Sequence, residues 1–240
     1  MKAFIKDCIK ANKKIYEYIN THISNLDYIY SGQIGFGGDK SLNIDLFAEN
    51  IFIEYLKSYG DIFSEESGYI SSNSSYKIII DPIDGSDNFS SNLPYFGTSI
   101  ALQKDNKTII AVVCNLATGI LIYKDENKKI KKLNLATNKY IDFLELQDSN
   151  IGIFERAYTN PKLCQKLYEN NIKYRSLGAV ALSLCDARNY SFVLFYGKIR
   201  EFDIAAGVYI CEDLNIYQSD KFLIVAKKIH IFNLIKDIIN

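Results

Sequence analysis

The spacing of apolar residues predicts two amphipathic helices near the start of the chain. In residues 4–19 and 44–56 the apolar positions recur every three or four residues, which is the pattern of one helix face. Asp45 and Glu49 lie four residues apart in the second helix, so both carboxylates should point the same way. A glycine-rich segment at residues 32–38 separates the two helices.

A series of strands is expected after the second helix. The serine-rich residues 67–75 are interpreted as a loop, and the apolar run 76–80 as a short strand that ends at Asp81. The polar run 127–132 alternates lysines with apolar residues, which favours the solvated edge of a hairpin over a patch that binds nucleic acid. Three further strands joined by short turns are expected between these segments, at residues 98–103, 108–115 and 119–123.

The pattern changes after residue 133, where strands and helices alternate. We expect strands at 151–154 and 191–196, helices at 161–170 and 179–187, and a further helix over 203–211. The chain is therefore expected to have an α+β fold. Its amino-terminal lobe would cover residues 1–135 and its carboxyl-terminal α/β lobe residues 136–240, the two forming one compact unit.

Composition and charge narrow the classes of partner. The chain has 240 residues, 48% hydrophobic and 23% charged, which is enough for a substantial core in a soluble globular protein. Its 28 Lys and Arg residues balance 28 Asp and Glu residues, so neither nucleic acid nor an anionic membrane is an expected partner. Residues 1–14 lack a signal-peptide core, and no apolar run approaches the ~20 residues of a membrane span. We therefore expect a cytoplasmic protein.

The histidines and cysteines limit the chemistry. The two histidines lie near opposite ends of the chain, and the five cysteines are widely spaced without a C-x-x-C pair. This distribution argues against a histidine triad, a zinc site and a disulfide framework. Any catalysis should therefore use carboxylates, hydroxyls, lysines or bound cations.

The densest chemistry lies in residues 81–89, with the sequence DPIDGSDNF. A strand would deliver Asp81 and Asp84 into a turn, and Gly85 and Ser86 would then open a helix. Carboxylates bind hard cations, whereas free N–H groups at a helix start bind an anion such as phosphate. Taken alone, the segment favours a purely structural turn followed by a capped helix over a binding site.

Other acidic segments favour a metal site. Gathering Glu65, Asp81, Asp84 and Asp203 in one cleft would be prohibitive unless the carboxyl groups stayed protonated or held divalent cations. A set of oxygen ligands without histidine or cysteine selects Mg²⁺ or Mn²⁺ over zinc or copper.

Several motifs together resemble the inositol monophosphatase family, part of the magnesium-dependent, lithium-sensitive sugar-phosphatase superfamily that includes fructose-1,6-bisphosphatases. The residues that carry the resemblance are Asp45-x-x-x-Glu49, Ser64-Glu65-Glu66, the 81–89 segment, residues 94–102, Arg175-Ser176-Leu177-Gly178 and Asp203-Ile204-Ala205-Ala206-Gly207. Residues 38–45 are most similar to members that act on both inositol phosphates and fructose 1,6-bisphosphate. The resemblance implies an αβαβα sandwich, a homodimer, two or three Mg²⁺ ions that Mn²⁺ could replace, and inhibition by Li⁺.

The resemblance also implies roles for individual residues. The metal ligands would be Glu65, Asp81, the carbonyl of Ile83, Asp84 and Asp203. Gly85 and Ser86 would present N–H groups to the phosphate. Asp45 would orient the Ser86 hydroxyl, and Glu65 would help to activate the attacking water. The candidate substrate contacts are Arg175, Gly178, Val180, Lys198 and Arg200, and the three basic residues among them could meet a second phosphate.

The function implied is hydrolysis of the phosphomonoester of a small sugar or polyol, such as an inositol phosphate or fructose 1,6-bisphosphate, by a metal-activated water. One alternative is a phosphatase of 3′-phosphoadenosine nucleotides, which would need a stacking surface for adenine. The other is a non-catalytic binding protein of the same fold. An unused cluster of like charges would destabilise such a protein, which favours the enzyme.

Overall fold

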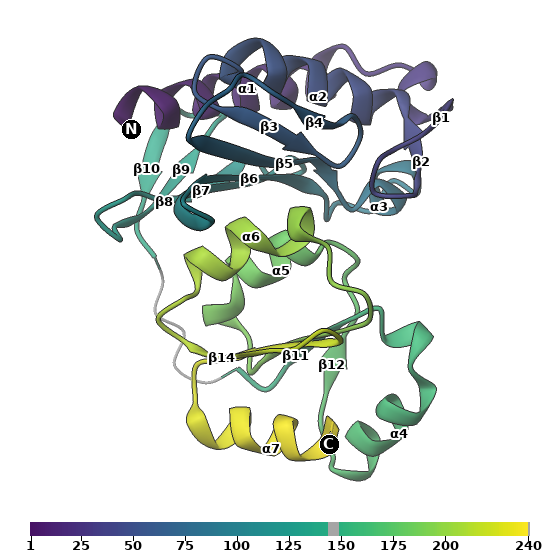
Figure 1. The fold of residues 1–240 in the computed structure, drawn as a ribbon. Coiled ribbons are helices and arrows are strands. Elements are labelled where there is room, and N and C mark those ends of the chain that lie inside the picture. Colours follow the sequence, from purple (N-terminus) through teal and green to yellow (C-terminus); the bar gives the residue numbers. More distant parts are fainter. Residues whose placement is uncertain (144–148, 240) are drawn as a thin grey trace.

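The computed structural model describes residues 1–143 and 149–239. Its helices and sheets stack in five alternating layers (Figure 1). Two long helices cover one face of an eight-stranded sheet, and two central helices separate its other face from a five-stranded sheet. Two outer helices cover the far face of the smaller sheet. This order confirms the layered αβαβα sandwich.

The elements are as follows. The α-helices are α1 (Lys2–Thr21), α2 (Asn43–Leu56), α3 (Ser86–Ser90), α4 (Pro161–Glu169), α5 (Val180–Cys185), α6 (Glu201–Ile210) and α7 (Ile229–Ile239). Short 3-10 helices are η1 (Asn25–Tyr28), η2 (Ala157–Thr159) and η3 (Ala187–Asn189).

The strands form three sheets. The eight-stranded sheet has the order β10 (Lys139–Ile141), β9 (Ile130–Asn134), β8 (Ile120–Lys124), β7 (Lys107–Asn115), β6 (Gly97–Lys104), β5 (Tyr76–Asp84), β3 (Asp61–Ser64) and β4 (Gly68–Ile70). The five-stranded sheet has the order β12 (Tyr174–Arg175), β11 (Gly152–Glu155), β13 (Val193–Tyr196), β15 (Phe222–Ala226) and β14 (Asn215–Gln218). A small hairpin pairs β1 (Tyr30–Ile34) with β2 (Lys40–Leu42).

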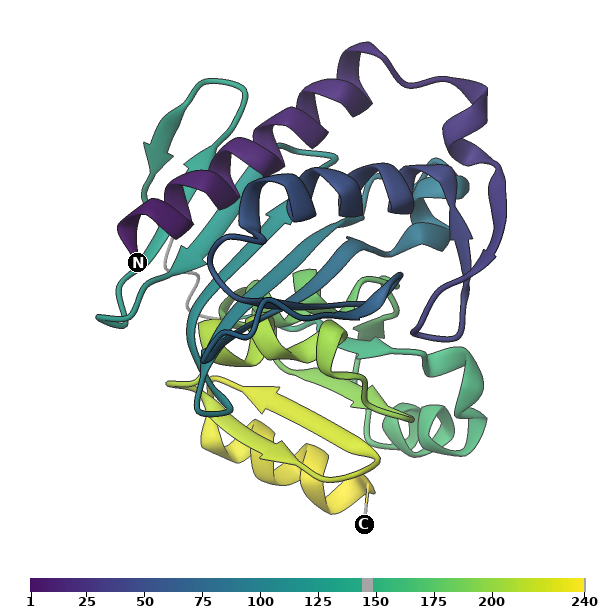
Figure 2. The ribbon, with the colours of Figure 1, turned by 45° about the horizontal axis from the view of Figure 1, so that its top comes forward.

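Alternation along the strands explains why each sheet is covered on both faces. Ile78 and Ile80 of β5 belong to the core under α1 and α2, whereas Ile79 belongs to the core against α5 and α6. In β13, Val193 packs with residues of the central helices and Leu194 with residues of α4 and α7. Successive strand residues point to opposite faces, so apolar runs without polar interruption produce sheets buried on both sides. Figure 2 shows α1 and α2 side by side across the larger sheet.

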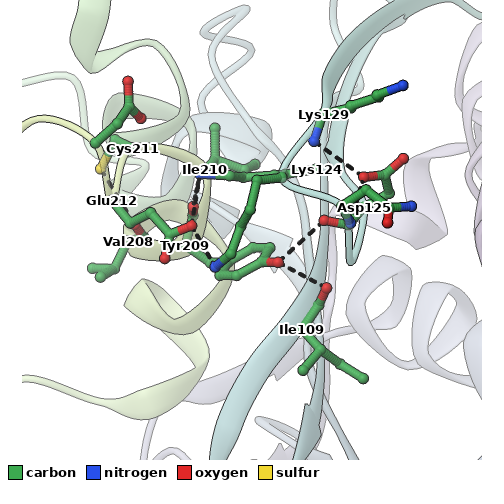
Figure 3. Close-up of polar contacts among 12 residues, drawn as sticks. Ile109, Lys124, Asp125, Lys129, Val208, Tyr209, Ile210, Cys211 and Glu212 are labelled. Atoms are coloured by element: carbon green, nitrogen blue, oxygen red, sulfur yellow. Dashed lines mark hydrogen bonds and ion pairs between the residues drawn. The ribbon is translucent and has the colours of Figure 1, made fainter.

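A polar cluster fastens the carboxyl-terminal end of α6 to the larger sheet (Figure 3). Lys124, at the end of β8, is only 3% exposed and donates to the Tyr209 carbonyl over 2.9 Å. Its Nζ also lies 3.0 Å from Oε1 of Glu212. The Tyr209 hydroxyl donates to the Ile109 carbonyl at 2.9 Å and approaches the Asp125 carbonyl at 3.1 Å. These contacts fix α6, whose first turn carries Asp203.

Three sequence expectations need correction. The strand that begins at Tyr76 runs on to Asp84, with an irregular register against β6 between Asp81 and Asp84. Residues 67–75 are not all loop, because β4 pairs there with β3. The hairpin at residues 127–132 exists, but β9 is not the sheet edge, because β10 pairs with it.

Other expectations are confirmed or stay predictions. Both amino-terminal helices, the meander of β6 to β8 and the later strands and helices form close to where the pattern placed them. The division at residue 135 stays a prediction, and the first sheet extends beyond it to Ile141. Within residues 1–143 and 149–239, none of the helices combines the length and apolar character that crossing a membrane requires.

Candidate active site

A cleft of about 680 Å³ opens where β5, α3, α5 and α6 meet. Sheet topology explains why acidic residues collect there. Strands β3 and β5 are parallel, with Ser64 opposite Ile80, so the residues that follow, Glu65 and Asp81, come out at the same edge. The amide of Glu65 donates to the Ile80 carbonyl over 3.1 Å, which holds the two segments together.

Three carboxylates converge in the cleft. Glu65, Asp81 and Asp203 each offer an oxygen such that all three atoms lie within 4.8 Å of one another. Asp203 comes from the first turn of α6, where the helix dipole favours an acidic residue. Oδ1 of Asp81 is buried and has no hydrogen-bond partner among the residues that the structure describes. A converging all-oxygen donor set with an unpartnered buried oxygen fits a hard divalent cation.

Asp84 lies beside this cluster and is held by α5. Its two oxygens accept hydrogen bonds from the backbone amides of Val180 and Leu182, at 2.9 and 3.1 Å. Burial raises the pKa of both Asp81 and Asp84 well above the usual range, and the neighbouring carboxylates add to the effect. A bound cation would favour the ionised forms instead.

The turn after Asp84 requires glycine. Gly85 has a φ of 91°, in the left-handed region. A Cβ at this position would lie 3.1 Å from both the Ala179 Cβ and the Gly178 carbonyl oxygen. The turn therefore brings the start of α3 against the segment that precedes α5, and Gly85, Ser86, Gly178 and Val180 all line the cleft.

Ser86 joins two of the predicted functional segments. Its hydroxyl oxygen lies 3.0 Å from Oδ1 of Asp45 and 2.9 Å from the Ile83 carbonyl. The other Asp45 oxygen accepts the Leu42 amide at 2.7 Å, near the start of α2. Burial raises the pKa of Asp45 to about 7, and the charge of Glu66 adds to the shift. Ser86 and Asp45 are therefore in contact as expected, and their roles stay predictions.

Glu49 lies on the same face of α2 as Asp45. It accepts hydrogen bonds from the Ser67 amide at 3.0 Å and the Ser67 hydroxyl at 2.8 Å. These bonds anchor the segment that carries Glu65 and Glu66. Helix α2 is thus linked to two acidic segments of the cleft: Asp45 contacts Ser86 in residues 81–89, and Glu49 contacts Ser67, which follows Glu65 and Glu66.

Arg200 is the main cation of the acidic cluster. It donates from Nε and Nη2 to the two oxygens of Asp203, at 3.0 and 2.9 Å. Its Nη1 lies 2.7 Å from Oε1 of Glu65 and 2.7 Å from Oδ2 of Asp39. Burial raises the pKa of Glu65 to about 7 despite the opposing effect of Arg200.

The predicted substrate residues divide into two groups. Gly178, Val180 and Arg200 line the cleft, whereas Arg175 and Lys198 are absent from the lining that the structure describes. Arg175 is exposed and donates to the neighbouring Tyr174 carbonyl. A contact of these two residues with substrate stays a prediction.

Sequence reasoning missed several residues of the cleft. Glu155 is buried and accepts hydrogen bonds from the Ser183 hydroxyl at 2.5 Å and the Gly178 amide at 2.8 Å. It is the last residue of the apolar strand β11, as Asp81 comes directly after the apolar run of β5, and that signal could have found it. Lys40 and Arg156 also line the cleft, without a comparable signal, and Glu66 of the predicted Ser64-Glu65-Glu66 motif lines it beside Glu65.

The five-layer fold and the acidic cleft at the end of β5 place the chain in the class of layered α+β folds of the sugar-phosphatase type. Comparison with known families then gives the narrower assignment. The chain belongs to the inositol monophosphatase family, whose model matches residues 38–215.

Individual relatives agree with this assignment. The chain is 29% identical over 214 residues to a fructose-1,6-bisphosphatase/inositol-1-monophosphatase of Methanocaldococcus jannaschii, covering 87% of this chain and 82% of the relative. It is 31% identical over 221 residues to the Nus factor SuhB of Haemophilus influenzae, covering 86% and 81%. A solved structure named as an inositol monophosphatase–fructose 1,6 bisphosphatase shares the fold, with a TM-score of 0.81 at 24% identity over 98% of this chain and 99% of that chain.

Proposed function

We propose that this protein is a Mg²⁺-dependent phosphatase that hydrolyses the phosphomonoester of a small sugar or polyol. The observation that carries the proposal is the convergence of Glu65, Asp81 and Asp203 within 4.8 Å beside the Gly85–Ser86 turn. Cation ligands and anion-binding N–H groups meet there, as a phosphate ester bound to a metal requires. The relative named for both phosphatase activities supports an inositol phosphate or fructose 1,6-bisphosphate as substrate.

The metal ions have a defined place in this proposal. Glu65, Asp81, Asp84, Asp203 and the carbonyl of Ile83 would hold them. Mg²⁺ at such a site supplies an activated water and neutralises charge that develops on the phosphate. Mn²⁺ is the expected substitute.

The remaining chemistry belongs to the residues of the chain. The backbone N–H groups of Gly85 and Ser86 would orient the phosphate oxygens. Asp45, whose pKa of about 7 suits proton exchange near neutral pH, would hold the Ser86 hydroxyl and take up the proton of the attacking water, which the hydroxyl would relay. Gly178 and Val180 would shape the pocket for the alcohol, and Glu155 would hold the Gly178 turn in place.

A phosphate-release assay tests the proposal. Inositol 1-phosphate, fructose 1,6-bisphosphate and 3′-phosphoadenosine 5′-phosphate would be compared while Mg²⁺ is titrated and Li⁺ is added. We expect Mg²⁺-dependent release that Li⁺ inhibits, with a sugar or inositol phosphate preferred. Asp81→Asn should abolish release, whereas the matched Asp186→Asn, at a partly buried acidic residue outside the cleft lining, should retain it. Metal-independent release would contradict the proposal, and preference for the adenosine nucleotide would support the alternative substrate class.

A binding role without catalysis is the second candidate, because one of the relatives bears the name Nus factor SuhB. This reading predicts no release from any substrate while the protein stays folded. The homodimer also stays a proposal, which sedimentation equilibrium would test.

A further inference from the structure

Arg200 contacts two of the carboxylates that a divalent cation would bind. Its guanidinium contacts both oxygens of Asp203 and Oε1 of Glu65. Both residues belong to the carboxylate cluster whose geometry fits a cation. The arginine side chain is four-fifths buried, with 19% exposure, so solvent screens these charges only partly.

Asp39 gives Arg200 a second, outward partner. The carboxylate of Asp39 is 73% exposed and lies 2.7 Å from the same Nη1 that contacts Glu65. It belongs to the segment between β1 and β2, which lies over the acidic residues: the Gly37 amide donates to the Glu65 carbonyl at 2.8 Å. A Cβ on Gly37 would meet the Glu65 side chain at 2.7 Å and Nη1 at 3.2 Å, so glycine leaves the room that the guanidinium occupies.

We propose that Arg200 is a built-in counter-cation that competes with the divalent metal for Glu65 and Asp203, and that metal binding transfers its guanidinium to Asp39. The inference rests on the proposed metal site. A doubly charged ion on Glu65 and Asp203 would repel the guanidinium and take the oxygens that it now contacts. Asp39 can keep the displaced group because it already shares Nη1 and lies toward solvent.

This arrangement has two consequences for the cleft. Without metal, Arg200 reduces the repulsion among the converging carboxylates and so supports the fold. With metal, the same residue lowers the apparent affinity, because its displacement is part of the binding equilibrium. Arg200 is thus a positioning residue that sets metal affinity rather than a catalytic residue.

Isothermal titration of the full chain with Mn²⁺, repeated with Mg²⁺, tests the competition directly. Arg200→Gln should bind the metal about tenfold more tightly or better, since one opposing charge within a few ångströms is removed. The matched control is Arg156→Gln, which removes another arginine that lines the same cleft. The Arg156 guanidinium lies over the Phe195 ring, 5.8 Å from its centroid, so its removal should change the affinity much less. Equal gains in metal affinity for both variants would show that loss of any positive charge near the cleft has this effect, and would overturn the inference.

A double-mutant cycle tests the transfer to Asp39. Asp39→Asn should weaken Mn²⁺ binding about threefold in the wild-type background, because the displaced guanidinium loses its acceptor. In the Arg200→Gln background the same change should have almost no effect. Equal weakening in both backgrounds would show that Asp39 acts only through its own charge, and the transfer would be wrong.

Thermal unfolding separates this inference from the proposed function. In EDTA, Arg200→Gln should melt below wild type, and saturating Mn²⁺ should remove the difference. If this variant does not fold, Arg200→Lys, which keeps one charge but loses the forked contacts, should show an intermediate gain in affinity. A wild-type chain that binds no Mn²⁺ would overturn both proposals. Wild-type binding with no gain in either Arg200 variant would overturn only this one.

Discussion

The Ser86 hydroxyl has a single hydrogen and two acceptors within reach, Asp45 at 3.0 Å and the Ile83 carbonyl at 2.9 Å. Donation to Ile83 leaves the hydroxyl oxygen free to accept a hydrogen bond from the protonated Asp45 carboxyl. Donation to Asp45 is strongest when that carboxyl is ionised. Because the pKa of Asp45 is raised to about 7, both arrangements are accessible near neutral pH.

Ser86→Thr and Ser86→Ala separate the hydroxyl from the backbone of the turn. Threonine keeps the hydroxyl, so we expect kcat within about tenfold of wild type, whereas alanine should lower kcat by about 100-fold or more. KM should change less in both, because the backbone N–H groups remain. Steady-state phosphate release measures both constants, and an alanine variant as active as the threonine variant would rule out a role for the hydroxyl.

Asp84→Asn should abolish Mg²⁺-dependent turnover and also lower stability. An amide offers one carbonyl oxygen, whereas the Val180 and Leu182 amides need two acceptors. One buried N–H would lose its partner, which costs about 1–3 kcal/mol in the free energy of unfolding. Urea unfolding and phosphate release measure the two effects. Turnover at the wild-type level would count against Asp84 as a metal ligand.

At the scale of residues, the sequence revealed those parts of the site that local motifs encode. Asp81 converges with Glu65 and Asp203 as expected, and Asp84 and Gly85, at the end of the same strand, line the same cleft. Residues that reach the cleft by long-range packing could not be placed. Arg175 illustrates this limit, because it belongs to a motif whose Gly178 lines the cleft, yet its own side chain points to a neighbouring carbonyl.

At the scale of elements, periodic helices and apolar runs of four or more residues were predictable, whereas the three-residue strand β4 was not. Strand β4 has three residues, and no alternation can be recognised over that length. Asp-Pro was interpreted as the end of β5, because proline lacks an N–H for the sheet. The strand continues because its register against β6 is irregular between Asp81 and Asp84, so Pro82 lies where pairing is interrupted.

The link between β8 and α6 gives a prediction with an internal control. Lys124 is buried and Lys128 is 56% exposed, yet both contact the Glu212 carboxylate, at 3.0 and 2.6 Å. Lys124→Met should lower the free energy of unfolding by about 2 kcal/mol, because the Tyr209 carbonyl also loses its donor. Lys128→Met should cost less than about 1 kcal/mol, as expected of an exposed pair. Chemical denaturation compares the two, and equal losses would contradict a special role for the buried contact.

At the scale of the whole molecule, the balance of charge hides a local imbalance. The chain carries equal numbers of acidic and basic residues, but the cleft gathers carboxylates from α2, β5, the segment after β3 and α6. Helix α2, the eight-stranded sheet that holds β3 and β5, and helix α6 are three successive layers of the stack. Packing of the layers therefore forces the carboxylates together, and the pKa values of the site report on the stability of the entire fold.

Stability should consequently depend on pH in opposite ways with and without metal. The raised pKa values of Asp45 and Glu65, both to about 7, mean that the folded chain holds protons that the unfolded chain has already released above about pH 4. The free energy of unfolding should therefore fall as pH rises from about 4 to about 7 in EDTA, by up to about 1.4 kcal/mol per unit for each such group, and level off above about pH 7. Asp81 and Asp84 shift in the same direction, whereas Asp61, whose pKa is lowered, titrates below this window.

Saturating Mg²⁺ should abolish or reverse this fall in the free energy of unfolding, because the ionised carboxylates then bind the ion and protons cease to compete. Thermal unfolding across this pH range in EDTA, Mg²⁺ and NaCl of matched ionic strength distinguishes specific binding from screening. If NaCl restored as much stability as Mg²⁺, screening of charge repulsion would explain the result, and a metal site would not be needed.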